Sequence, residues 1–189
     1  MAKLIINNQE IEIDNSATVM DACKKAGIDI PHFCYHPKLS ISGNCRMCLV
    51  EIERSLKPVA SCAQPVAEGM IVKTNSPMVE QARKNVLELL LLNHPLDCPV
   101  CDQGGECDLQ DLTIKHGPGK SANIFPRRLV SEKNMGPLVG TVMTRCIHCT
   151  RCVRFINEVA GSPEIGAFSR GEEMEISKYI KKNLDSELS

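Results

Sequence analysis

The start of the chain alternates apolar and polar side chains as a half-buried β-hairpin does. The apolar positions flank an Asn7-Asn8 pair and are Leu4, Ile6, Ile11 and Ile13. An Asn pair favours the left-handed backbone of a two-residue turn, so this pattern predicts two antiparallel strands. The next apolar positions have helical spacing and are Val19, Met20, Cys23 and Ala26. They predict a helix, with Ser16 as its cap and Gly27 as its end.

Two later segments have the β-branched, alternating character of strands. They are residues 48–52 and 70–73, and the turn-rich stretch 31–44 precedes the first of them. Two strands, a helix and further strands are the order of a β-grasp fold. We therefore expect an α+β chain whose first domain, residues 1–75, is a β-grasp, ferredoxin-like domain.

Residues 76–140 contain less regular structure. Ser76 and Pro77 form a helix cap followed by proline at the first helical position, and an apolar stripe then continues to residue 93. This predicts a helix. Beyond it, a short helical pattern at 106–116 stands among loops rich in Gly and Pro. We expect this stretch to be a small, loop-rich second domain.

Residues 141–189 are expected to form the start of a third domain. Val153, Ile156 and Ala160 fall on one face of a predicted helix that Gly161 ends. The remainder is short and polar, and it has the look of an unfinished domain. Small α/β segments are therefore predicted after the first domain.

Composition narrows the functions that such a chain can have. The net charge is -1, with 22 Lys and Arg against 23 Asp and Glu, which disfavours a nucleic-acid-binding surface. No apolar run approaches the length of a membrane span, so membrane contact is expected only through partners.

The residues available for hydrophobic cores are few. Trp is absent, and four Phe and two Tyr are the aromatic residues, so several small hydrophobic cores need another source of stability. Eleven Cys without a signal segment indicate metal binding in a reducing compartment.

The first cysteine group has the spacing C-x10-C-x2-C-x13-C. Its members are Cys34, Cys45, Cys48 and Cys62. Four thiolates in a ferredoxin-like domain suit a 2Fe-2S cluster, although plant-type ferredoxins have a shorter first gap, C-x4-C-x2-C. Gly43 would let the backbone approach and direct N–H groups at the sulfur atoms. The alternative is a zinc site that uses the same four residues.

The second group has three cysteines, Cys98, Cys101 and Cys107. Three thiolates leave a 4Fe-4S cubane one ligand short. The nearby candidates for the fourth are His94, Asp97, Asp102, Asp108 and His116. Imidazole is a better ligand for iron than an exposed carboxylate, so chemistry favours the two histidines without choosing between them.

The third group has the spacing C-x2-C-x2-C, with ligands expected at Cys146, Cys149 and Cys152. This spacing is typical of a 4Fe-4S cubane, but no cysteine follows to complete the site. The unassigned Cys23 lies on an apolar helix face and is predicted to be a core residue. Three arginines, Arg145, Arg151 and Arg154, bracket this group. Their charge could offset that of a thiolate-ligated cluster, or they could form a solvated basic face.

In their order along the chain, the three groups resemble the N-terminal iron-sulfur region of the large electron-transfer subunit of respiratory complex I. The first quartet, the run from His94 to Cys107, and Cys146-Ile-His-Cys-Thr-Arg-Cys-Val-Arg-Phe carry the resemblance. It implies a 2Fe-2S cluster, a 4Fe-4S cluster with His94 as its fourth ligand, and a second 4Fe-4S cluster that is incomplete in this chain. In the family the missing cysteine lies further along, so we expect an N-terminal fragment of such a subunit, a split subunit or a truncated chain.

The resemblance implies electron relay from the flavin of a partner NADH-oxidising subunit toward quinone. The partners would be this and other peripheral-arm subunits, facing the bacterial cytoplasm or the mitochondrial matrix. The sequence has no Gly-rich dinucleotide fingerprint and no acid-base pair, so no catalytic residue is expected in this chain. The alternatives are an electron-transfer subunit of a soluble NAD-linked hydrogenase or formate dehydrogenase, and a zinc-stapled interaction protein.

Overall fold

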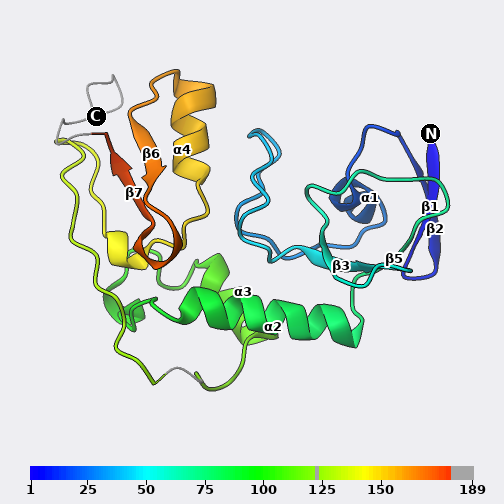
Figure 1. The fold of residues 1–189 in the computed structure, drawn as a ribbon, viewed down its shortest axis with the longest axis horizontal. Coiled ribbons are helices and arrows are strands. Elements are labelled where there is room, and N and C mark those ends of the chain that lie inside the picture. Colours follow the sequence, from blue (N-terminus) through cyan, green and yellow to red (C-terminus); the bar gives the residue numbers. More distant parts are fainter. Residues whose placement is uncertain (122–123, 180–189) are drawn as a thin grey trace.

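A mixed sheet and one helix form the N-terminal part of the protein, and the computed structural model describes residues 1–121 and 124–179. The strands are β1 (Ala2–Ile6), β2 (Gln9–Ile13), β3 (Leu49–Ile52), β4 (Val59–Ala60) and β5 (Ile71–Lys73). Their order in the sheet is β2-β1-β5-β3-β4, with β1 parallel to β5 and the other pairs antiparallel. Helix α1 (Val19–Lys25) lies beside this sheet (Figure 1). It buries Val19 and Cys23 in a core with Leu4 and Val72 of the sheet. The expected α+β class is confirmed.

The predicted hairpin is present, and its turn consists of Asn7 and Asn8. Both residues have left-handed backbone, with φ of 46° and 71°, as a two-residue hairpin turn requires. The Asn7 side chain also donates to Thr74 Oγ1 at 2.6 Å and accepts from the Thr74 N–H at 2.9 Å. The turn between β1 and β2 is thereby fastened to the end of β5.

Helix α1 begins at a different cap from the predicted Ser16. The cap is Thr18, whose hydroxyl accepts from the Asp21 N–H at 3.2 Å, while Asp21 Oδ2 accepts from the Thr18 N–H at 2.9 Å. This reciprocal pair needs an acidic or amide side chain three residues after the cap. Thr18 has Asp21 at that position, whereas Ser16 has the apolar Val19. The prediction of Ser16 was therefore wrong by two residues.

Helix α2 (Pro77–Leu91) crosses from the sheet to the second half of the molecule (Figure 1). Its predicted cap is confirmed, because Ser76 Oγ accepts from the Val79 N–H at 3.4 Å. A 3-10 helix (Cys98–Val100) and α3 (Asp108–His116) follow. Leu87 of α2 and Leu109 of α3 share a second core with Phe33 and Met47, which come from the loop before β3. That long loop is thus held between the sheet and α2.

The C-terminal part ends in a hairpin that the sequence pattern did not indicate. Helix α4 (Arg151–Phe155) continues as a π-helix (Ile156–Ala160), and Gly161, with φ of 69°, ends it as predicted. Strands β6 (Ile165–Phe168) and β7 (Glu175–Lys178) then pair antiparallel. One short 3-10 helix, Met143–Arg145, precedes α4, and another, Gly171–Glu173, lies between β6 and β7. Residues 162–179 therefore form a structured unit, with Ile165 and Ile176 packed on Met135, while the predicted unfinished end, residues 180–189, lies outside the described residues.

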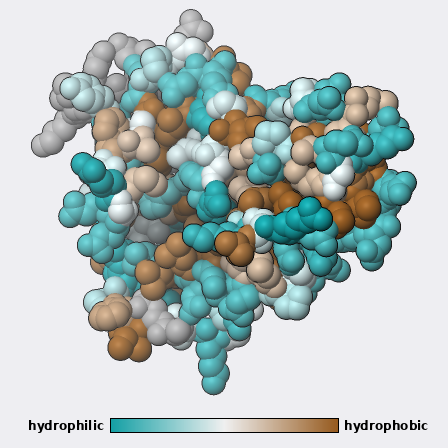
Figure 2. Space-filling view, turned by 45° about the vertical axis from the view of Figure 1, so that its right-hand side comes forward, coloured by the Kyte–Doolittle hydropathy of each residue, from teal (hydrophilic) through white to brown (hydrophobic). Residues whose placement is uncertain are grey.

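The surface carries apolar side chains as well as charged ones. Figure 2 shows hydrophobic residues between hydrophilic ones on the face that it draws. Leu96, Val100, Leu129 and Leu138 are among the exposed apolar residues of the second half. Within residues 1–121 and 124–179, no helix is both long and apolar enough to cross a membrane.

Candidate functional site

The four cysteines of the first group lie together in the interior, between the loop that precedes β3 and the turn that follows β4. All four are buried, and Cys34 and Cys62 have no exposed surface. The backbone N–H of Cys34 donates to the Cys45 sulfur at 3.3 Å. Hydrogen bonds from Cys45 and Cys62 lower the pKa of the Cys34 thiol. A hydrogen bond from Cys62 lowers the pKa of Cys48 to about 6. The structure thus connects all four thiols by sulfur contacts.

The loop that carries Cys45 depends on left-handed backbone. Gly43 has φ of 64°, a conformation that glycine adopts at no steric cost. A Cβ at Gly43 would meet only the Ala63 Cβ, at 3.8 Å, so the backbone angle, and not crowding, requires the glycine. The Asn44 backbone also lowers the pKa of Cys34 by hydrogen bonding. At least one N–H beside Gly43 is therefore directed at a thiol of the first group.

The thiols of the first group are arranged as a connected set and not around a single point. Among the described residues, no three Cys, His, Asp or Glu side chains converge as ligands of one metal ion. A polynuclear cluster needs no such convergence, because its ligands surround several irons. Cys23 of α1 lies in the N-terminal core, to which Cys48 and Cys62 also belong, and burial raises the pKa of its thiol to about 11.

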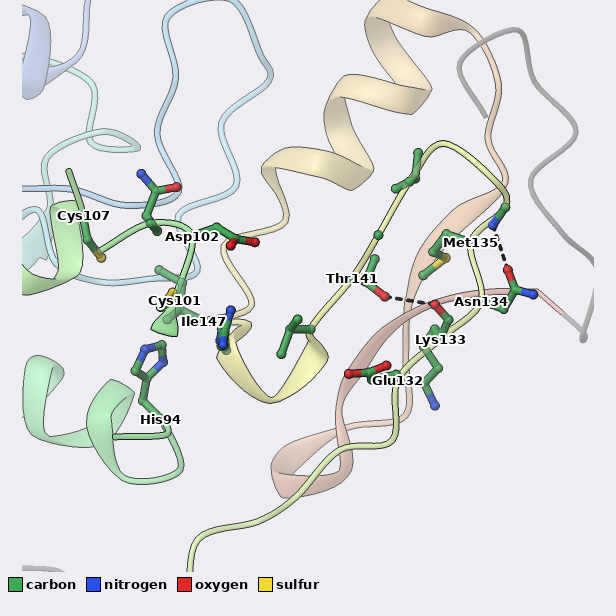
Figure 3. A pocket seen from close by; sticks show the side chains of 16 residues that line it. His94, Cys101, Asp102, Cys107, Glu132, Lys133, Asn134, Met135, Thr141 and Ile147 are labelled. Atoms are coloured by element: carbon green, nitrogen blue, oxygen red, sulfur yellow. Dashed lines mark hydrogen bonds between the residues drawn. The ribbon is translucent and has the colours of Figure 1, made fainter. Parts of the chain in front are cut away.

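The second group lines one cavity together with His94. The cavity has a volume of about 140 Å³, and its walls include His94, Cys98, Cys101 and Cys107. Burial lowers the pKa of His94, which favours the neutral imidazole that binds metals. In Figure 3 the His94 ring points toward Cys101, and the segment from Glu132 to Thr141 lies across a wider cavity of about 930 Å³. The predicted ligands of the second group therefore share a common space.

The structure places the two histidines that ligand chemistry leaves open in different cavities. His116 lies at the end of α3 and lines a different cavity, with Glu80 and Lys84 of α2.

The loop of the second group is closed tightly by Gly104. A Cβ there would approach the carbonyl oxygens of Cys98 and Cys101 to 2.7 and 3.1 Å. Only glycine fits that position without a backbone shift.

The third group lies in a turn and the first residues of α4. His148 and Thr150, between its cysteines, both have left-handed backbone, with φ of 55° and 58°. Cys146 packs on the C-terminal core, and Cys149 packs on the second core, beside Ile147. Burial raises the pKa of both Cys146 and Cys152. His148 is half-buried, and burial lowers its pKa.

One cavity of about 410 Å³ joins the three groups. Its walls include Cys45 of the first group, His94 beside the second and Cys146 of the third. Leu90 of α2 and Ile147 also line it. We call this space the junction cavity. It places one predicted ligand from each group around a common, partly apolar volume.

Three arginines fasten the third group to the other two, which the sequence did not reveal. Arg154 is buried; it donates to the carbonyl of Ser40 at 2.6 Å, to that of Cys149 at 3.2 Å, and to that of Cys34. The sequence left open a solvated basic face for these arginines. At Arg154 the burial and the contacts contradict that reading.

The other two arginines make similar long-range contacts. Arg151 donates to the Tyr35 carbonyl at 2.7 Å. Arg145 donates to Asp97 Oδ2 at 2.7 and 2.9 Å, and the bonded carboxylate raises its pKa. Asp97 is thereby engaged as an ion-pair partner next to Cys98. Apart from Cys149, the partners named for these arginines lie 48 to 120 residues away in sequence, so no local signal could have identified them.

Three family models match successive parts of the chain. A 2Fe-2S iron-sulfur cluster binding domain matches residues 1–77. The iron-sulfur binding region of NADH-ubiquinone oxidoreductase-G matches residues 83–122. The ferredoxin-like domain of NADH-quinone oxidoreductase subunit 3 matches residues 136–189.

Curated relatives match the chain over its full length. The G subunit of NADH-quinone oxidoreductase from Rickettsia prowazekii is 59% identical over 100% of this chain and 28% of its own. The 75 kDa subunit of NADH-ubiquinone oxidoreductase of Reclinomonas americana is 59% identical over 100% of this chain and 27% of its own. The mitochondrial 78 kDa subunit of Neurospora crassa is 57% identical over 99% and 25%. The chain thus spans about a quarter of the length of these relatives.

A solved structure has the same fold. It is a chain of an NAD+-reducing nickel-iron hydrogenase in the H2-reduced state, with a TM-score of 0.88 and 30% identity. The match covers 100% of this chain and 80% of that one.

Proposed function

Because the chain belongs to the family of the G, or 75 kDa, subunit of NADH-quinone oxidoreductase, as its N-terminal iron-sulfur region, we propose that it relays electrons. The electrons would pass through three iron-sulfur clusters, from the flavin of an NADH-oxidising partner toward quinone. The observation that carries the proposal is the junction cavity, which Cys45, His94 and Cys146 line together. Bound clusters supply one-electron chemistry there. The protein ligates them, buries them and sets their surroundings.

We assign each cluster to the residues that fit its chemistry. The connected buried thiols of the first group suit a 2Fe-2S cluster within a β-grasp domain of residues 1–75. His94 with Cys98, Cys101 and Cys107 would hold a 4Fe-4S cluster in residues 76–140, since the four line one cavity. Cys146, Cys149 and Cys152 would give three ligands of a second 4Fe-4S cluster in residues 141–189. Its fourth ligand is absent from the sequence.

The relay requires no proton-transfer residue, and we assign no catalytic side chain. The proposed partners are the flavin-bearing NADH-oxidising subunit and other subunits of the peripheral arm. They would bring the chain to the membrane. We place it in the peripheral arm of complex I, facing the bacterial cytoplasm or the mitochondrial matrix.

A second candidate function follows from the likeness to the hydrogenase chain. An electron-transfer subunit of an NAD-linked hydrogenase would use the same fold, and the match covers most of that chain. The identity of 30% is lower than the 57 to 59% shared with the NADH-quinone oxidoreductase relatives named above. We therefore favour the complex I assignment. Co-purification with a quinone-linked partner or with a hydrogenase would separate the two.

The chain should acquire iron and acid-labile sulfide when it is reconstituted anaerobically. Reduction should then give the electron paramagnetic resonance signal of a 2Fe-2S cluster, and Cys48→Ala should abolish it. Cys23→Ala is the matched control, because Cys23 is a buried thiol outside the group.

Three results would contradict this proposal. They are zinc without labile sulfide in the purified protein, an unchanged 2Fe-2S signal in each single variant of Cys34, Cys45, Cys48 and Cys62, and loss of the signal in the Cys23→Ala variant alone.

A further inference from the structure

The interior of the protein holds buried positive charge without buried negative charge. Among residues 1–121 and 124–179, the charged side chains that are buried are Arg83, 5% exposed, and Arg154, 8% exposed. No Asp or Glu of this part of the chain is buried with them. Burial of a charge is costly unless a partner compensates it. The ion pairs of the described residues include neither of these two arginines.

Arg83 is the less satisfied of the two. Its guanidinium makes one hydrogen bond, to the Leu49 carbonyl at 3.3 Å, and its Nε is buried without a partner. The ion pairs of the described residues do not include it. Glu80, one turn earlier on α2, is exposed and lies beyond ion-pair distance.

Arg83 lies against the first cysteine group. Leu49, its hydrogen-bond partner, directly follows Cys48 in the chain. Burial lowers the pKa of Arg83, and the charges of Cys48, Glu80 and Cys23 act in the opposite direction, with that of Cys48 the largest. The nearby Cys23 cannot serve as counter-ion, because burial keeps its thiol neutral, with a pKa of about 11. Apart from Glu80, which is exposed to solvent, the place for negative charge next to Arg83 is the first group itself.

We propose that Arg83 is the built-in counter-ion of the 2Fe-2S cluster held by Cys34, Cys45, Cys48 and Cys62, and that it raises the reduction potential of that cluster. This inference rests on the proposed function, which supplies the cluster. Two ferric ions, two sulfides and four thiolates carry a doubly negative charge. One electron from the partner subunit makes it triply negative, and no bond forms or breaks. A fixed cation in a low-dielectric interior favours the more negative state.

The proposal predicts opposite effects of one substitution in two states of the protein. In the apo chain, Arg83→Met removes an uncompensated buried charge, so stability against urea should be unchanged or higher. In the reconstituted chain the same change removes the counter-ion, so the cluster-loaded protein should lose stability relative to wild type. A purely structural role for Arg83 would lower stability in both states.

The decisive measurement is the midpoint potential of the 2Fe-2S signal in a redox titration of the reconstituted chain. Arg83→Met should shift the reduction equilibrium about tenfold toward the oxidised cluster, which is a fall of 59 mV for a one-electron couple. Arg83→Gln keeps a donor for the Leu49 carbonyl but no charge, and should shift equally. Arg83→Lys keeps the charge and should retain most of the wild-type potential.

Lys84→Met is the control, because it removes the same charge from the adjacent, exposed position of α2. Its effect should be screened by solvent and salt. If Arg83→Met fails to load a cluster, the Gln and Lys variants still decide the question. Equal potentials for Gln, Lys and wild type would overturn the inference. A wild-type chain that forms no 2Fe-2S cluster would instead contradict the proposed function.

Discussion

Replacement of Arg154 by methionine should weaken the attachment of the third cysteine group to the loop of the first. Methionine keeps an apolar stem like that of arginine but has no guanidinium and no donors. It removes the hydrogen bonds to the carbonyls of Ser40, Cys34 and Cys149. Because Cys34 is fully buried, its carbonyl would be left without a partner, whereas the exposed Ser40 can bond to water.

The cost follows from the energy of hydrogen bonds to charged groups. Each is worth about 1.5 to 3 kcal/mol, and a buried acceptor left unpaired costs about 1 to 3 kcal/mol. Rehydration at Ser40, and relief from burying the guanidinium, offset part of the sum. We expect a net loss of about 2 to 4 kcal/mol in the free energy of unfolding for Arg154→Met. Arg151→Met, which removes one bond to the Tyr35 carbonyl, should cost about 1 kcal/mol.

Urea unfolding under anaerobic, reducing conditions measures these differences. Amide hydrogen exchange should show the loss of protection concentrated around Cys34 and Cys149. Arg170→Met is the control, because Arg170 is exposed and its change should be neutral. An Arg154→Met protein with wild-type unfolding midpoint and exchange would refute the view that this residue joins the two groups.

Two further predictions concern the second group and the pH dependence of the fold. His94→Ala should eliminate or shift the signal of the cluster ligated by Cys98, Cys101 and Cys107, whereas His116→Ala should leave it unchanged; the reverse result would show that the wrong histidine was chosen. Hydrogen bonds from the Ser40 hydroxyl and N–H hold the pKa of Glu158 below its ordinary value of 4.5, so the carboxylate stabilises the fold above pH 4.5 and this contribution is lost as the pH falls further. Glu158→Gln should therefore reduce stability near neutrality but flatten its acid dependence in urea unfolding, and parallel curves for the two proteins would contradict this account.

The elements with strong local signals were predictable from the sequence. The Asn7-Asn8 turn and the Ser76-Pro77 start of α2 each combine a backbone preference with a clear apolar pattern. Cap selection at α1 failed because it depended on a second residue, Asp21, that completes the reciprocal pair. The hairpin of β6 and β7 was not predicted, because its two strands are very short and give little apolar pattern. Ile165 and Ile176 supply its buried apolar contacts.

The candidate site likewise has a part that the sequence predicts and a part that only the fold reveals. The cysteine spacing identified the three groups, because ligand spacing is a local property of the chain. The contacts of Arg83 and Arg154 are not local, since their partners lie 34 to 120 residues away in sequence, except for Cys149. From sequence alone, a charged residue in a helix is expected to face solvent. No sequence pattern therefore marked Arg83 as a buried residue.

Cluster binding and folding should be coupled unequally along the chain. The first group lies beside a core that includes α1 and the sheet, from Leu4 to Val72. Among the described residues, the core around the third group has Met135, Ile165 and Ile176 as its buried members, with partly buried residues such as Val153 packed against them. A core this small stabilises little by burial alone, since each buried aliphatic side chain contributes about 1.5 to 3 kcal/mol. Hydrogen bonds to the first loop, such as those of Arg154 and Glu158, and the cluster that we propose for the third group should therefore matter more for the stability of the C-terminal part than for the sheet, which has its own apolar packing.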